Sequence, residues 1–281
     1  MVVSMFNIKK LFLKLKINIS SIIFYYKKRI FIKKLANTTL ENMKKISRKK
    51  LEKKSDLPIH LAIGHENLSS VVSLVKNQYD NFVLTHRNIH FNFALSDQSD
   101  YEKIINETLL EKESINAGNY GCMTMRNSRK GIIYTSSILA NNISVGLGIA
   151  STNFKNGVTW IQTGDGAIEE GAFYEGMVFA KSRNLPTIII IENNNWSLGS
   201  SIKERRNDIN IKLLANSIGI GYQEIKNVNS IYEISTKIFK AREEAKFNTQ
   251  IIEVQLKTLG GKMTKERGYQ SYHCGPITLY D

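Results

Sequence analysis

The sequence predicts a doubly wound α/β domain, with a mostly parallel sheet and helices on both faces, preceded by a basic helical extension. The segment 186–192 (PTIIIIE) has five consecutive apolar or β-branched residues without alternation, which is typical of a strand buried on both faces, and 157–163 (GVTWIQT) is another predicted strand. A helix-forming segment, 167–183, separates them, and strands that alternate with helices favour a parallel sheet. A chain of 281 residues is long enough to bury a substantial core.

The net charge of +14 is concentrated at the N-terminal end of the chain. Of the 39 basic and 25 acidic residues, positions 1–55 contain 16 and 2, so 23 of each remain in positions 56–281. The body is therefore neutral, which excludes a basic nucleic-acid groove there, and we expect no nucleic-acid partner. We divide the chain into an extension, 1–56, and one domain, 57–281.

The extension mixes Leu, Ile and Phe with Lys every few residues, so it is too interrupted for a signal peptide or a membrane span. Two interpretations remain for it: an extension that covers a partner or stays unpacked, or contact of residues 1–35 with an anionic membrane surface. Only Cys122 and Cys274 are present, too few for a disulfide framework, so a cytoplasmic location is expected.

The remaining elements follow in chain order. Apolar spacing predicts helices, and short apolar runs predict later strands. The segment 80–94 (DNFVLTHRNIHFNFA) is a short strand or turn, and 135–152 is a helix whose small residues allow close packing against backbone or ligand. The other predicted helices are 38–54, 67–78, 101–113 and 230–246, and the other predicted strands are 220–225 and 249–256.

Asp165 and Asn194 each follow a predicted strand and are therefore expected at the same edge of the sheet. Asp165 lies between two glycines, just before a helix whose N-terminal N–H groups favour anions. A carboxylate, an amide oxygen and phosphate oxygens form the all-oxygen site that Mg²⁺ prefers. The two segments therefore predict a magnesium and diphosphate site.

The segments GDGAIEEGAFYEG (164–176) and ENNNWSLGSS (192–201) resemble the thiamine diphosphate motif of the 2-oxo acid dehydrogenase E1 component, alpha subunit family. Three further segments are similar to that family: IHLAIGHENLSSV (59–71), LTHRNIHFNFA (84–94) and SSILANNISVGLGIA (136–150). The resemblance covers about residues 57–260. It implies the thiamine diphosphate-binding fold, with thiamine diphosphate and Mg²⁺ as cofactors.

The resemblance also implies roles for individual residues. Asp165, the Asn194 side chain and the Trp196 carbonyl would ligate Mg²⁺, and Gly164, Gly166 and Ala167 would lie at the diphosphate. Arg87 would bind the diphosphate with His86 beside it, and Ser137 and Leu139 would contact the aminopyrimidine. His86 is one of two candidate catalytic residues.

The chain departs from the family pattern at three places. His65 replaces a glutamine, and His90 lies one position later than the family histidine. Gly261 stands where the family has a histidine near the diphosphate. A later segment, SYHCGPI (271–277), resembles the end of the equivalent transketolase domain, so His273 is the second candidate catalytic residue and the expected replacement.

The resemblance implies an enzyme that decarboxylates a 2-oxo acid and transfers the acyl group, with a lipoyl carrier as acceptor. Two alternatives stay open: a split transketolase-like or carboligase subunit that transfers a two-carbon or acyl unit in sugar metabolism, and a non-catalytic, membrane-docked binding protein. The glutamate that activates the pyrimidine belongs to a beta subunit in this family. No pyrimidine-binding domain is recognisable before Asp281, so an α₂β₂ assembly is expected, with no turnover by the chain alone.

Overall fold

The chain forms one six-stranded parallel sheet in a computed structural model, which describes residues 1–281 except 1, 56, 154–156, 198–199 and 260–281. The strand order is β2-β1-β3-β4-β8-β7 and every pairing is parallel. The strands are β1 (Asn81–Thr85), β2 (Ile132–Ser136), β3 (Thr159–Gly164), β4 (Thr187–Asn193), β7 (Gly221–Ile225) and β8 (Gln250–Gln255). The predicted fold class is confirmed.

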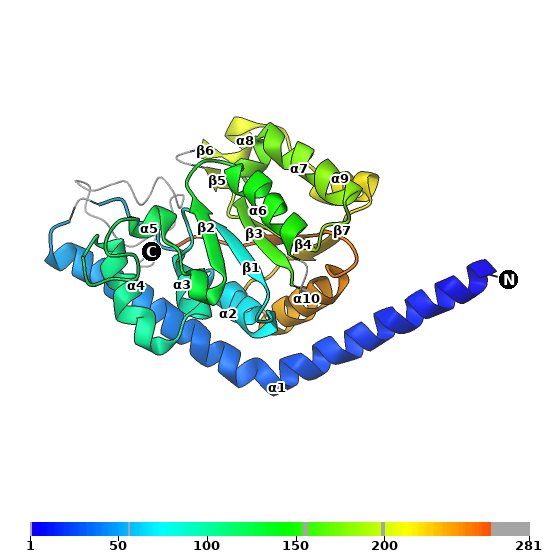
Figure 1. The fold of residues 1–281 in the computed structure, drawn as a ribbon, viewed down its shortest axis with the longest axis horizontal. Helices are drawn as coiled ribbons and strands as arrows, with labels where there is room; N and C mark the ends of the chain where they lie inside the picture. Colours follow the sequence, from blue (N-terminus) through cyan, green and yellow to red (C-terminus); the bar gives the residue numbers. More distant parts are fainter. Residues whose placement is uncertain (1, 56, 154–156, 198–199, 260–281) are drawn as a thin grey trace.

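Helices cover both faces of the sheet (Figure 1). The isoleucine run of β4 supplies side chains to the buried core on each face. Ile188 and Ile190 join one buried cluster, whereas Ile189 and Ile191 join the other. Alternate side chains of a strand point to opposite faces, so an unbroken apolar run fits a strand covered on both sides. The first face is covered by α1 (Val2–Glu52), α2 (Glu66–Val75) and α10 (Ile231–Glu244), and the second by α6 (Asn141–Thr152), α7 (Gly171–Ser182) and α9 (Ile211–Ile218).

The long helix α1 runs along the outside of the molecule, and its second half belongs to the packed body (Figure 1). Met43 and Ile46 are fully buried in a third cluster with Ile59, Phe93 and Ile104. This cluster lies among α3 (Ile89–Leu95), α4 (Tyr101–Thr108) and α5 (Gly121–Thr124). None of the described helices combines the length and the hydropathy that a bilayer crossing requires.

The structure differs from the predicted elements at several places. The helix predicted over 101–113 ends at Thr108, and α5 and α9 were not predicted. The segment 80–94 contains strand β1 and then helix α3, and β2 precedes the predicted helix 135–152, which begins at Asn141. The helix after Asp165 begins as a 3₁₀ turn, and α7 starts only at Gly171. The short elements are the 3₁₀ turns η1 (Gln98–Asp100), η2 (Ser128–Lys130) and η3 (Ala167–Glu169), the strands β5 (Trp196–Ser197) and β6 (Ser200–Ser201), and the helix α8 (Ile202–Arg205).

Small residues bring α6 and α7 close to the sheet and to each other, as the sequence predicted for the segment 135–152. A Cβ atom placed on Gly146 of α6 would lie 2.5 Å from Ile161 of β3. A Cβ on Gly176 of α7 would lie 2.5 Å from Ile143 of α6. Both glycines therefore permit helix packing that a larger residue would prevent.

Candidate cofactor site

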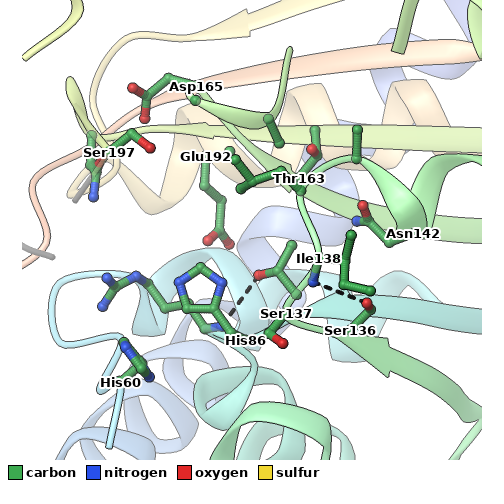
Figure 2. A pocket seen from close by; sticks show the side chains of 18 of the residues that line it. His60, His86, Ser136, Ser137, Ile138, Asn142, Thr163, Asp165, Glu192 and Ser197 are labelled. Atoms are coloured by element: carbon green, nitrogen blue, oxygen red, sulfur yellow. Dashed lines mark hydrogen bonds between the residues drawn. The ribbon is translucent and has the colours of Figure 1, made fainter. Parts of the chain in front are cut away.

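A cavity of about 360 Å³ opens at the carboxyl edge of the sheet, where β1, β2, β3 and β4 end (Figure 2). Open α/β sheets bind ligands at this edge. Figure 2 shows Asp165 on one side of the cavity and His60 and His86 on the other. The lining residues are His60, His65, Thr85, His86, Arg87, Met123, Ser136, Ser137, Ile138, Leu139, Ala140, Asn142, Thr163, Gly164, Asp165, Gly166, Ala167, Glu192, Asn194, Trp196 and Ser197.

Asp165 and Asn194 reach this cavity from neighbouring strands. Gly164 of β3 pairs with Glu192 of β4 in parallel register, so the residues that follow these strand ends are brought together. Both residues line the cavity. The parallel crossover therefore places the carboxylate and the amide at one site, 29 positions apart in the chain.

The three consecutive asparagines form a turn that is held by hydrogen bonds from the backbone to side chains. The side-chain oxygens of Asn193 and Asn194 accept hydrogen bonds from the backbone N–H groups of Asn195 (3.2 Å) and Trp196 (3.0 Å). Asn195 has a φ of 67°, a left-handed conformation that asparagine tolerates better than most residues. The Asn194 oxygen keeps a second lone pair, which is available to a ligand.

Arg205 of α8 pairs with Asp165, a contact that the sequence analysis did not predict. Its Nη2 donates to Asp165 Oδ2 at 2.7 Å, and its Nε donates to Glu169 at 3.0 Å. Burial raises the pKa of the Asp165 carboxyl, and the ion pair with Arg205 opposes that shift. The guanidinium thus supplies a cation where the sequence predicted a metal.

A buried carboxylate, Glu192, lines the cavity and anchors a hydrogen-bond network. It accepts from His65 Nδ1 (3.0 Å), His90 Nε2 (3.0 Å) and Gln162 Nε2 (2.9 Å). Burial alone would raise the pKa of Glu192, but the two histidines and these hydrogen bonds hold it well below its ordinary value. Glu192 is therefore ionised.

This network reaches Asn194 through Thr258. The Asn194 amide donates to Thr258 Oγ1 at 2.8 Å, and the hydroxyl lies 2.8 Å from His65 Nε2. Because the Nδ1–H of His65 donates a hydrogen bond to Glu192, Nε2 of the neutral ring is an acceptor and the Thr258 hydroxyl donates to it. The distances among His65, His90 and Glu192 are short enough for a shared metal ion. Both histidines, however, already form hydrogen bonds to the Glu192 carboxylate through the atoms that such an ion would use.

His60, His86 and Arg87 form the wall opposite Asp165. The His60 and His86 rings meet edge to face, with centroids 4.9 Å apart. Arg87 is buried, and its Nη1 donates to the Leu61 carbonyl at 2.6 Å. The charged side chain that was predicted to bind a diphosphate is therefore fixed at the cavity wall.

The loop between β2 and α6 forms the rim of the cavity. The Ser136 hydroxyl accepts from the Ile138 backbone N–H at 3.2 Å, and Ala140 adopts a left-handed conformation with a φ of 55°. This geometry leaves the side chains of Ile138 and Leu139 exposed, at 68% and 47%. The rim therefore presents an apolar surface.

Each predicted site residue in the described part of the chain lines this cavity. These residues are Arg87, His86, Ser137, Leu139, Gly164, Asp165, Gly166, Ala167, Asn194 and Trp196. His273, Gly261 and Cys274 lie outside the described residues. His90 belongs to the buried network behind the wall, which agrees with its displaced position in the sequence.

Two residues of the site, Glu192 and Arg205, were not predicted from the sequence. Glu192 ends the apolar run of β4, and an acidic residue at the carboxyl end of a predicted buried strand was the available signal. Arg205 had none, because it reaches Asp165 through the β5–β6 hairpin, a connection that no local pattern indicates.

The fold and the cavity define an α/β ligand-binding domain with its site at the carboxyl edge of a parallel sheet. The profile of the family described as "Dehydrogenase E1 component" matches residues 35–231, well over half of the chain. The chain therefore belongs to the dehydrogenase E1 component family, and the resemblance identified in its sequence is confirmed.

The relatives include pyruvate dehydrogenase E1 component alpha subunits. The one from Rickettsia bellii is 26% identical over 219 residues, covering 75% of this chain and 66% of the relative. The mitochondrial one from Chaetomium thermophilum is 32% identical over 145 residues, covering 50% of this chain and 34% of the relative. The chain thus matches between about a third and two thirds of the length of these relatives.

Solved structures confirm the fold. Transketolase from Leishmania mexicana superposes with a TM-score of 0.61 at 20% identity, over 80% of this chain and 36% of that chain. A transketolase mutant from Pichia stipitis gives a TM-score of 0.60 at 16% identity, over 88% of this chain and 39% of that chain.

Proposed function

We propose that the chain is the alpha-type subunit of a thiamine diphosphate-dependent enzyme that decarboxylates a 2-oxo acid and transfers the acyl group. The observation that carries the proposal is the meeting of Asp165 and Asn194 in one cavity, opposite Arg87. Membership of the dehydrogenase E1 component family and the named relatives support the same activity.

The donor set of the cavity fits a divalent cation bound to a diphosphate. Asp165, the Asn194 side chain and the Trp196 carbonyl would hold Mg²⁺ through oxygen atoms. Gly166 and Ala167 would offer backbone N–H groups to the diphosphate, and Arg87 would add charge-assisted hydrogen bonds. Ser137 and Leu139, on the opposite rim, would contact the aminopyrimidine.

When bound, thiamine diphosphate supplies the electron sink for carbon–carbon bond cleavage next to a carbonyl. The protein contributes orientation and proton handling. His86 and His60, held edge to face, can accept or donate a proton on the side of the cavity opposite Asp165. The ionised Glu192, through His65 and Thr258, orients the Asn194 amide so that the second lone pair of its oxygen would be available to the metal.

A beta subunit completes the site in this proposal. The side chains of Ile138 and Leu139 form an exposed apolar rim, which favours contact with a second polypeptide. That polypeptide would close the cavity at this rim. That partner would carry the glutamate that activates the pyrimidine. An α₂β₂ assembly would hold the cofactor at each α/β contact, and a lipoyl carrier would take the acyl group.

The test is an activity assay on the chain co-produced with its beta-type partner, with pyruvate or a branched 2-oxo acid as substrate and a lipoyl domain as acceptor. We expect acylation of the lipoyl domain, its loss in Asp165→Asn, and no turnover by the chain alone. Transfer of a two-carbon unit between sugar phosphates, without lipoyl acylation, would support the transketolase-like alternative. Cofactor binding with neither reaction would support a non-catalytic role.

A further inference from the structure

Helix α1 carries two apolar stripes, and the body covers only one of them. The covered stripe includes Ile17, Ile32 and Ala36, all buried. The second stripe consists of six exposed residues, from 39% exposed at Ile22 to 73% at Ile30. At about 100° of rotation per residue these six fall within an arc of about 100°, on the side away from the covered stripe. The exposed stripe is Leu15, Ile19, Ile22, Ile23, Tyr26 and Ile30.

The rest of the body leaves this stripe uncovered. Phe24 packs on Phe239 and Tyr25 on Tyr232, with ring centroids 5.6 and 5.2 Å apart, which fixes the opposite side of the helix to α10. Toward its N-terminus α1 extends beyond the body (Figure 1). The family profile begins only at residue 35, so the exposed stripe lies outside the part shared with the family.

The charge around the stripe has one sign. The first 40 residues contain nine Lys and Arg and no Asp or Glu. By helical position, Lys16, Lys27 and Lys34 lie along one edge of the stripe and Arg29 along the other. The salt bridges that α1 forms in the described part of the chain lie in its second half, from Lys44, Lys45 and Lys49.

We propose that the exposed stripe of α1 binds the surface of an anionic lipid bilayer, with the helix lying in the plane of the headgroups. An apolar face with basic residues at its edges is the pattern of such interfacial helices, since the apolar side chains enter the acyl boundary while the lysines reach the headgroups. The body lies on the other side of α1, so it does not obstruct a flat surface.

The charge pattern also decides between a membrane and a protein partner. Two copies of this helix would place basic edges against each other, which disfavours self-pairing. In a coiled coil, charges of both signs beside the apolar interface set the register of the two helices. The exposed stripe is flanked by positive charges alone, so it does not fit a coiled-coil partner of this kind. A lipid surface requires no register, so uniform positive charge suffices.

The experiment is flotation of the full-length chain, in complex with its partner, with vesicles of phosphatidylglycerol and phosphatidylcholine. We expect the complex to float with these vesicles and not with phosphatidylcholine alone. The triple variant Ile19→Ser, Ile22→Ser, Tyr26→Ser should weaken partitioning on the order of 100-fold, since it removes three apolar side chains from the interface. Each of Lys16→Gln, Lys27→Gln and Lys34→Gln should weaken it about fivefold.

Phe247→Ser is the matched control, because Phe247 is 72% exposed after the end of α10 and outside the stripe. It should float like the unchanged chain. Absence of flotation with anionic vesicles, or equal flotation with neutral ones, would overturn the proposal. Self-association that the triple variant abolishes in sedimentation without lipid, with no flotation, would assign the stripe to a second copy and equally overturn it.

Discussion

Arg205 Nη2 donates to Asp165 Oδ2 at 2.7 Å, so the carboxylate proposed to bind magnesium is paired with a cation of the chain itself. Arg205 also contacts Glu169 and the Ser200 carbonyl, which hold it in place. A divalent ion must share or displace this guanidinium, because both use the same carboxylate. In the proposed site, the ion pair would therefore weaken metal binding.

Replacing Arg205 by glutamine should tighten binding of Mg²⁺ in the presence of thiamine diphosphate by about tenfold. The variant removes a charge-assisted hydrogen bond that competes for Asp165. Calorimetric titration of Mg²⁺ into the complex with its partner measures the effect. Arg206→Gln is the control, since Arg206 pairs with Glu169 at 2.9 Å. Weaker metal binding in Arg205→Gln would show that the arginine supports the site instead.

Replacing Thr258 by valine should weaken metal-dependent cofactor binding by about five- to tenfold. Valine has a similar shape but leaves the Asn194 amide and His65 Nε2 without the hydroxyl that joins them. Thr258→Ser should restore binding, and Thr236→Val in α10 should have no effect. Normal affinity in Thr258→Val would mean that Asn194 holds its orientation without this network.

Replacing His65 by glutamine should make the free energy of unfolding depend less steeply on pH below about 6.5. Burial lowers the pKa of His65 below its ordinary 6.5, although Glu192 opposes the shift. Below pH 6.5 the unfolded chain therefore binds a proton that the folded chain resists, and the free energy of unfolding falls as pH decreases. The variant should lose this contribution, worth up to about 1.4 kcal/mol per pH unit. Urea unfolding at several pH values would contradict the account if the two proteins gave parallel curves.

Replacing Asp80 by alanine should lower the free energy of unfolding by about 3–5 kcal/mol. Asp80 lies just before β1, at the opposite edge of the sheet, and accepts from Arg242 at 2.8 and 2.9 Å and from Trp160 Nε1 at 2.8 Å. Removal leaves Arg242 buried without this carboxylate. Chemical denaturation measures the change, and cofactor affinity at a temperature where the variant is folded should be unaltered. A loss below about 1 kcal/mol would show that the pair is dispensable.

The sequence predicted those parts of the fold whose signal is local. β3, α7 and β4 were expected within a few residues of their observed bounds, because the apolar runs and the Gly-Asp-Gly turn are distinctive. α3 was missed because all seven of its residues are buried, so Ile89–Leu95 shows no polar face. β2 was missed because it is a short edge strand directly before a Gly- and Ser-rich segment.

The site residues were predicted from the ends of two strands and from the family resemblance. Those in the described part of the chain line one cavity. Their partners could not be predicted. Thr258 lies 64 positions from Asn194, and Glu192 is 127 positions from His65, so only the folded sheet brings them together. The first half of α1 showed no single apolar face, since its two stripes lie on nearly opposite sides of the helix.

The most direct test of the account is calorimetry of thiamine diphosphate with Mg²⁺ on the complex, comparing the unchanged chain with Asp165→Asn and Asn194→Ala. Asn193→Ala is the matched control, since the Asn193 side chain bonds Glu253 and the Asn195 backbone. We predict Mg²⁺-dependent binding that both site variants weaken by at least about 100-fold, with the control within about threefold. Unchanged binding in Asp165→Asn and Asn194→Ala would contradict the account.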